Sequence, residues 1–109
     1  MALKRTNVLF DNGLSALETY ERIVSITIAR SKKDNDASVS LNINFGLWTS
    51  KARSDAGNQA VEHLSIALRG DEAAKCITVN NDILATAYAA VKAHEPVRGE
   101  PDYRNASDV

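Results

Sequence analysis

An unbroken alternation of apolar and polar residues between Ser38 and Trp48 constrains the fold of this chain more than any other feature. The apolar members of the alternation are Val39, Leu41, Ile43, Phe45 and Leu47. Successive side chains of a β-strand point to opposite faces of a sheet, so this row shares one face. A slip of one residue in the strand pairing would turn the whole row to solvent, and the register is therefore strongly specified.

A second strand is expected just before this one. Residues 21–30 are rich in β-branched side chains, which favour strands. The alternation assigns Val24, Ile26 and Ile28 to one face and Ile23, Ser25 and Thr27 to the other. The polar segment Ser31–Ala37 between the two strands is typical of a hairpin loop.

The segment Val61–Gly70 fits two structures. Val61, Leu64 and Leu68 have the spacing of a helix stripe, whereas Leu64, Ile66 and Leu68 alternate as in a strand. We favour the strand, because two strands alone are marginally stable and a third completes a sheet. Thr49–Gln59 is polar and is expected to connect the second and third strands, with a frayed helical turn as the alternative. Cys76–Val79 is a further short extended candidate.

The last regular element is an amphipathic helix. Its apolar stripe consists of Ile83, Leu84, Ala87, Tyr88 and Val91. Asn80 is a candidate N-cap, and Pro96 ends the helix. The sequence thus predicts a small α+β fold, an antiparallel β-meander of about three strands packed by one C-terminal helix. Residues 20–95 form this domain, with an N-terminal arm at 1–19 and an extended C-terminal tail at 96–109.

Composition excludes several classes of protein. The 13 Lys and Arg residues balance 14 Asp and Glu residues without a basic stripe, which does not favour binding to nucleic acid. The single cysteine, Cys76, excludes an internal disulfide framework. The chain has neither an apolar run long enough for a bilayer nor an N-terminal signal segment, so we expect no membrane partner and synthesis in a cytoplasm.

No catalytic or metal-binding pattern emerges from the residues. His63, His94 and Cys76 lack the spacing of metal ligands or of a nucleophile with its base. Asp34 and Asp36 lie in an expected turn, where aspartate is favoured for local hydrogen bonds. We therefore predict a protein that is not an enzyme, with no catalytic residue, metal, cofactor or small-molecule substrate.

The candidates for contacts with a partner are Phe10, Trp48, Ala85, Ala89 and Tyr103. Trp48 ends the strongest strand on the face opposite Phe45 and Leu47, where it either covers the second face of the sheet or anchors a partner. Ala85 and Ala89 belong to a row spaced by four residues, which is either helix-favouring filler or a smooth surface for close packing.

Short motifs in this order resemble small structural proteins of tailed bacteriophages. The motifs are Tyr20–Ile26, Leu64–Leu68, the helical Ala87–Lys92, and the closing Asn105–Val109. The resemblance covers residues 20–109, although Val91 stands where those proteins carry leucine. It implies no catalytic residues. It implies a part of a virion or tail that works through protein contacts.

We therefore expect a structural or adaptor subunit located in a virion and made in the cytoplasm of the host bacterium. Its expected partners are other virion proteins and copies of itself, contacted through the sheet and the extended termini. The alternative is a small phage-encoded binding module that inhibits or regulates a host protein. A module of that kind needs one compact binding patch and makes no use of ordered chain ends.

Overall fold

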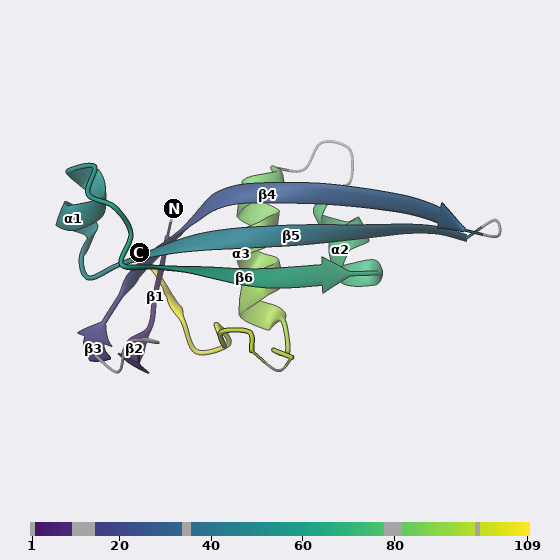
Figure 1. Cartoon of the computed structure of the whole chain (residues 1–109). Coiled ribbons are helices and arrows are strands. Elements are labelled where there is room, and N and C mark those ends of the chain that lie inside the picture. Colours follow the sequence, from purple (N-terminus) through teal and green to yellow (C-terminus); the bar gives the residue numbers. More distant parts are fainter. Residues whose placement is uncertain (1, 10–14, 34–35, 78–81, 98) are drawn as a thin grey trace.

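The computed structural model of the chain describes residues 2–9, 15–33, 36–77, 82–97 and 99–109. Its elements are β1 (Leu3–Lys4), β2 (Thr6–Leu9), β3 (Ser15–Glu18), β4 (Tyr20–Lys33), β5 (Asp36–Trp48), α1 (Lys51–Asp55), β6 (Glu62–Arg69), α2 (Asp71–Cys76), α3 (Ile83–Ala93) and β7 (Ser107–Asp108). The long strands β4, β5 and β6 form one layer, and α2 and α3 lie against one face of it (Figure 1). We call this the helix face and the opposite side the outer face.

The main sheet has the order β6-β5-β4-β1-β7, and all its neighbouring strands are antiparallel. A second sheet pairs β2 with β3. The predicted meander is present as β4-β5-β6, and Val61–Gly70 contains the strand that we favoured. The predicted numbers of about three strands and one helix were too low. Strands β1 and β7 extend the sheet, and α1 and α2 occupy segments that we had expected to be connections.

The core lies between the sheet and the two helices. The predicted row on β5 supplies its centre, because Leu41, Ile43, Phe45 and Leu47 are all 0% exposed. Strand β6 pairs with β5 so that Leu64, Ile66 and Leu68 face Phe45, Ile43 and Leu41. The helix contributes Ala87, Tyr88 and Val91, as its apolar stripe predicts. These side chains pack in one hydrophobic cluster, except Leu47, which packs with Val8.

A β-bulge in β4 changes the faces that we predicted for this strand. Ile23 pairs with Phe45 and Ser25 pairs with Asn44, which leaves Val24 as an extra residue. An extra residue shifts the alternation by one position, so Ile23 and Ile26 both pack against the core. The assignment of Ile23 to the face opposite Ile26 was therefore wrong, and Val24 is 50% exposed.

The residues at the starts of α2 and α3 favour the beginning of a helix. Gly70 joins β6 to α2 at φ 60°, a left-handed value that favours glycine. Asp71 and Glu72 lie in the first turn of α2, where the helix dipole favours negative charge. The cap of α3 is Asp82, whose carboxylate accepts hydrogen bonds from the N–H groups of Leu84 and Ala85. The predicted cap Asn80 lies outside the described residues, as do residues 78 and 79 of the extended candidate Cys76–Val79, while Cys76 itself ends α2.

The two ends of the chain are part of the sheet. Leu3 pairs with Asp108 and Lys4 with Ser107, and the N–H of Val109 donates to the carbonyl oxygen of Ala2 at 3.1 Å. Leu3 also pairs with Glu21 at the start of β4. We had expected residues 1–19 and 96–109 to extend from the domain as an arm and a tail. Instead, their pairing completes the fold. None of the helices within the described ranges has the length and apolarity that a bilayer crossing requires.

Candidate functional site

Trp48 covers the outer face of the sheet, which is the first of the two alternatives that we considered. Its side chain is 9% exposed, and its Nε1 donates a hydrogen bond to the carbonyl oxygen of Asn58 at 2.8 Å. Ala2 and Tyr20 pack around it. The ring lies above Gly46, where any Cβ would come within 2.6 Å of it. Trp48 thus contributes to the interior of this chain and does not project as an anchor.

Tyr103 also belongs to the interior, although we had placed it in an extended tail. It is 0% exposed, and its ring stacks on Phe45 with centroids 4.7 Å apart. The residues on either side hold its backbone: the Arg104 guanidinium and N–H both donate to Asp102. These hydrogen bonds from Arg104 lower the pKa of Asp102 to about 2. The C-terminal segment therefore closes over the core.

The alanine row is accessible on α3. Ala89 is exposed and Ala85 is partly buried. Shallow hollows border the row on both sides, one of about 290 Å³ between α2 and α3 and one of about 300 Å³ that also includes Lys92 and Asp108. Phe10, the remaining candidate, lies outside the described residues. The predicted contact residues thus do not form one site.

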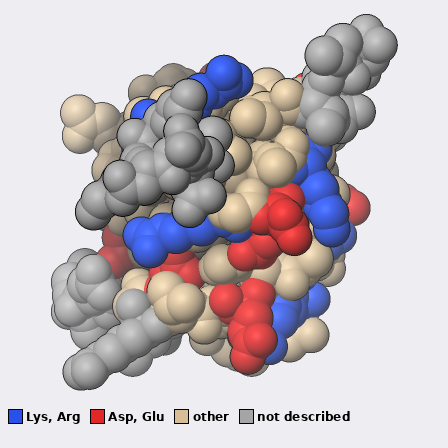
Figure 2. All heavy atoms as spheres, turned by 90° about the vertical axis from the view of Figure 1, so that its right-hand side faces the viewer, with Lys and Arg blue, Asp and Glu red and all other residues tan. Residues whose placement is uncertain are grey.

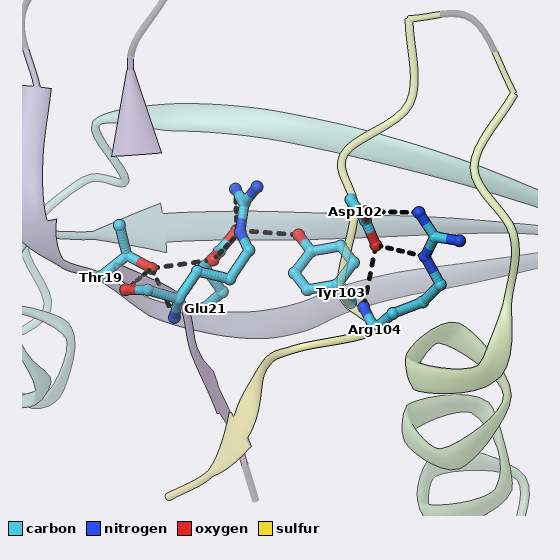
Figure 3. Close-up of polar contacts among 6 residues, drawn as sticks. Thr19, Glu21, Asp102, Tyr103 and Arg104 are labelled. Atoms are coloured by element: carbon cyan, nitrogen blue, oxygen red, sulfur yellow. Dashed lines mark hydrogen bonds and ion pairs between the residues drawn. The ribbon is translucent and has the colours of Figure 1, made fainter. Parts of the chain in front are cut away.

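A buried polar cluster, which sequence reasoning missed, lies at the start of β4. We call Arg5, Thr19, Glu21 and Tyr103 the Glu21 cluster (Figure 3). The Glu21 side chain is 0% exposed, and each of its carboxylate oxygens accepts two hydrogen bonds. Arg5 donates to both oxygens, at 2.6 and 2.8 Å, while Thr19 and Tyr103 donate one bond each at 2.8 Å.

The Glu21 cluster holds the two chain ends against β4. The Arg5 guanidinium carbon also lies 4.8 Å from the centre of the Tyr103 ring. Burial and the neighbouring Glu21 carboxylate raise the pKa of Tyr103 well above its ordinary value, so the hydroxyl keeps its proton. Three side chains of this chain donate to all the lone pairs of the Glu21 carboxylate. The carboxylate therefore links the two chain ends to β4.

One signal in the sequence points to this cluster. Glu21 is two residues before Ile23, and it pairs with Leu47, so it lies in the same row as the core side chains. A charged residue in a core row requires a partner, because burial of an unpaired charge is costly. The partners Arg5 and Tyr103 are too distant in the sequence to be identified from local patterns.

His94 forms a second polar connection at the end of α3. Its side chain is almost buried, and its two ring nitrogens lie 2.8 Å from carboxylate oxygens of Glu72 and Glu100. An imidazole that donates to two carboxylates carries both protons. Burial by itself lowers the pKa of His94, but the hydrogen bonds to Glu100 and Glu72 outweigh burial, and the pKa is raised.

Glu100 in turn protects one edge of the sheet. Its carboxylate accepts a hydrogen bond from the N–H of Ala67 on the edge strand β6, at 2.9 Å, and another from the N–H of Val97. An edge strand presents N–H and C=O groups that can pair with other chains, and proteins commonly cover them. The C-terminal segment thus places a charged side chain against the backbone of β6.

The opposite border of the meander differs. Strand β1 pairs with β4 only at Glu21, and the N–H of Ile23 donates to the Tyr88 hydroxyl at 2.8 Å. From Val24 to Lys33, the side of β4 that faces away from β5 has no strand partner among the described residues. We call this stretch the free edge; it forms the upper border of the sheet in Figure 1. Val24 and Ile28 on it are 50% and 45% exposed.

The surroundings of the candidate nucleophile and metal ligands do not favour either role. Cys76 is buried and donates to the carbonyl oxygen of Glu72, and burial together with Glu72 raises the pKa of its thiol, which disfavours the nucleophilic thiolate. Within the part of the chain that the structure describes, no three His, Cys, Asp or Glu side chains are grouped to hold a metal ion. Lys and Arg side chains are interspersed with Asp and Glu on the end of the molecule shown in Figure 2.

No protein-family model, curated protein or solved structure matches this chain.

Proposed function

We propose that this chain is a non-enzymatic structural or adaptor subunit of a bacteriophage virion that works through protein–protein contacts of its sheet. The observation that carries the contact-making role is the free edge. The virion setting rests on the resemblance of the short motifs Tyr20–Ile26, Leu64–Leu68 and Ala87–Lys92 to small phage structural proteins.

The free edge supports a contact-making role because soluble proteins usually protect such edges. Here Glu100 protects β6, whereas β4 presents the apolar Val24 and Ile28 without a comparable cover among the described residues. Addition of a strand from another chain is a common mode of protein recognition, in which backbone hydrogen bonds provide affinity. The proposal therefore keeps the expected contacts of the sheet and drops those of the chain ends, which the Glu21 cluster ties down.

Mass spectrometry of purified virions tests this role. We expect the chain in particles of a phage that carries its gene, in fixed proportion to the other structural proteins. An Ile28→Lys variant places a charge on the free edge and should be incorporated poorly. Ser65→Lys, a matched change on the exposed part of β6, should be incorporated normally.

Absence of the wild-type chain from particles, despite its production in infected cells, would refute the virion role. Equal incorporation of the two variants would refute the role of the free edge. If a single host protein instead co-purifies with the chain in fixed proportion, the alternative of a small regulatory binding module replaces the virion role.

A further inference from the structure

We infer that the free edge of β4 pairs in antiparallel orientation with the free edge of a second copy of this chain, which joins two sheets into one. The inference rests on the proposed contact-making function and names one partner for it. It is carried by the directions of the backbone groups, by the length of the hairpin and by the order of charges along the strand.

The backbone groups of Ile26 and Ile28 point away from the sheet. Residues of a strand direct their N–H and C=O groups alternately to the two sides. The N–H of Ala67 leaves the sheet toward Glu100, so Asn42, its partner on β5, bonds toward β4. Asn42 pairs with Thr27. Thr27 therefore bonds toward β5, and its neighbours Ile26 and Ile28 direct their N–H and C=O groups outward along the free edge.

The hairpin formed by β4 and β5 extends beyond its third strand. Strand β6 ends with Arg69, which pairs with Ser40. Past that point β4 and β5 continue to pair as far as Lys33 and Asp36. A two-stranded hairpin in water is marginally stable, and a third strand makes it considerably more stable. With a two-fold axis at Thr27, the strand of a second copy lies beside residues 24–30 of β4, so each hairpin is paired on that side up to about the point where β6 ends.

The free edge is complementary to itself. In a two-fold dimer the same surface is used by both copies, which an antiparallel strand pair satisfies. With the axis at Thr27, Ile26 of each copy faces Ile28 of the other. Opposed apolar side chains stabilise a strand pair, whereas like charges directly opposite destabilise it. An axis at Arg30 would set two arginines against each other and is therefore disfavoured.

Sedimentation equilibrium of the full chain over a range of concentrations tests the inference. The wild type should be a dimer that dissociates on dilution. Ile28→Pro removes an outward N–H that β5 does not use, and proline is tolerated at such positions of an edge strand. We expect the dissociation constant of the dimer to rise at least about tenfold. Ser65→Pro makes the same change at an outward N–H of β6 and should leave the dimer intact.

Disulfide trapping provides a readout that does not depend on tolerance of proline. An axis at Thr27 brings the two Thr27 Cα atoms to about 4.5 Å, within the range for a disulfide bond. In a Cys76→Ser background, Thr27→Cys should form a covalent dimer under oxidising conditions. Asn42→Cys lies on the same outer face but one strand further from the axis, and it should form no covalent dimer.

A wild-type chain that stays monomeric at high concentration would overturn the inference, as would a dimer that dissociates in Ser65→Pro but persists in Ile28→Pro. Thr27→Cys and Asn42→Cys cross-linking equally would also overturn the Thr27 register. None of these results bears on the presence of the chain in virions. Particle mass spectrometry decides that question separately, so failure of the dimer and failure of the virion role are distinguishable.

Discussion

The two halves of β4 contrast in what they bury. At its start β4 lies between β1 and β5, and there the charged Glu21 side chain is 0% exposed. Past the bulge it borders the sheet, and the apolar Val24 is 50% exposed. The contrast teaches that burial in this strand follows from the neighbours that pair with it and not from the hydrophobicity of each residue. One half is tied to the chain ends, and the other has no strand partner on the side away from β5 among the described residues.

The largest expected effect is at the tied half. Glu21→Ala leaves the Arg5 charge buried without its partner, a change that typically costs about 3–5 kcal/mol of unfolding free energy. Urea denaturation measures this cost. The control is Glu18→Ala, which removes an exposed ion pair to Lys4 at 3.5 Å and should cost no more than about 1 kcal/mol. Similar losses of unfolding free energy for Glu21→Ala and Glu18→Ala would contradict the contrast between the buried and the exposed ion pair.

A smaller effect is expected at Gly46 on the outer face. An alanine Cβ there would lie 2.6 Å from Cη2 of Trp48, whose ring is held by Ala2 and Tyr20. Overpacking of this kind costs about 1–3 kcal/mol. The fluorescence of Trp48, the single tryptophan, should shift as its ring moves. Ser40→Ala on the same strand and face is the control. An unshifted spectrum with unchanged stability would contradict this expectation, because it would show that the methyl group is accommodated without displacement of the ring.

We call the hydrogen bonds that link His94 to Glu72 and Glu100 the His94 clamp. This clamp should make the stability of the fold depend on pH. Because the pKa of His94 is raised, the stability that its charge contributes to the fold is complete below the ordinary pKa of 6.5. This stability is lost as pH rises through the folded-state pKa. For Glu100, burial is outweighed by hydrogen bonds from Ala67, His94 and Val97, and its pKa is lowered. That contribution is complete above the ordinary value of 4.5 and is lost as pH falls through the folded-state pKa.

We therefore expect the clamp to contribute fully between pH 4.5 and 6.5 and progressively less on either side. The measurement is the unfolding free energy of the wild type and of His94→Gln from pH 4.5 to well above 6.5, and the two values should converge as pH rises through the folded-state pKa of His94. His63→Gln, which changes an exposed histidine on β6, should run parallel to the wild type. A constant difference between wild type and His94→Gln would show that the charge of His94 does not stabilise the fold.

The smallest effect on stability is expected at the free edge. Ile28 is 45% exposed, so Ile28→Thr should change the unfolding free energy by about 0.5 kcal/mol or less. The same variant should weaken self-association, because it removes apolar surface from the proposed pairing. A large loss of stability in the monomer would show that this half of β4 is as firmly packed as the half that contains Glu21.

Patterns that repeat along the chain predicted the long elements. Strand β5 and helix α3 each carry an apolar row at the period of their structure, and both were identified with their buried faces. Strand β6 was distinguished from a helix only by the need for a third strand. The fold class followed from these elements, because a sheet with one apolar face requires a covering layer.

Elements without a period escaped prediction. Strands β1 and β7 have two residues each, and α1 and α2 have five and six, too few to show an alternation or a stripe. The bulge at Val24 changes the alternation without a local signal such as glycine. The Glu21 cluster depends on pairings between the two ends of the chain. Such features are set by tertiary packing, which local propensities do not record.

The pairing of the chain ends has a consequence for how the protein is made. Tyr103 lies 82 residues after Glu21, and β1 cannot pair with β7 until residues 107–108 are available. During synthesis the sheet therefore stays incomplete until residues 107–108 leave the ribosome. Contacts so distant in sequence slow folding, to milliseconds or longer in domains that depend on them. Until Tyr103 is available, Glu21 lacks the hydrogen bond that the Tyr103 hydroxyl donates to it.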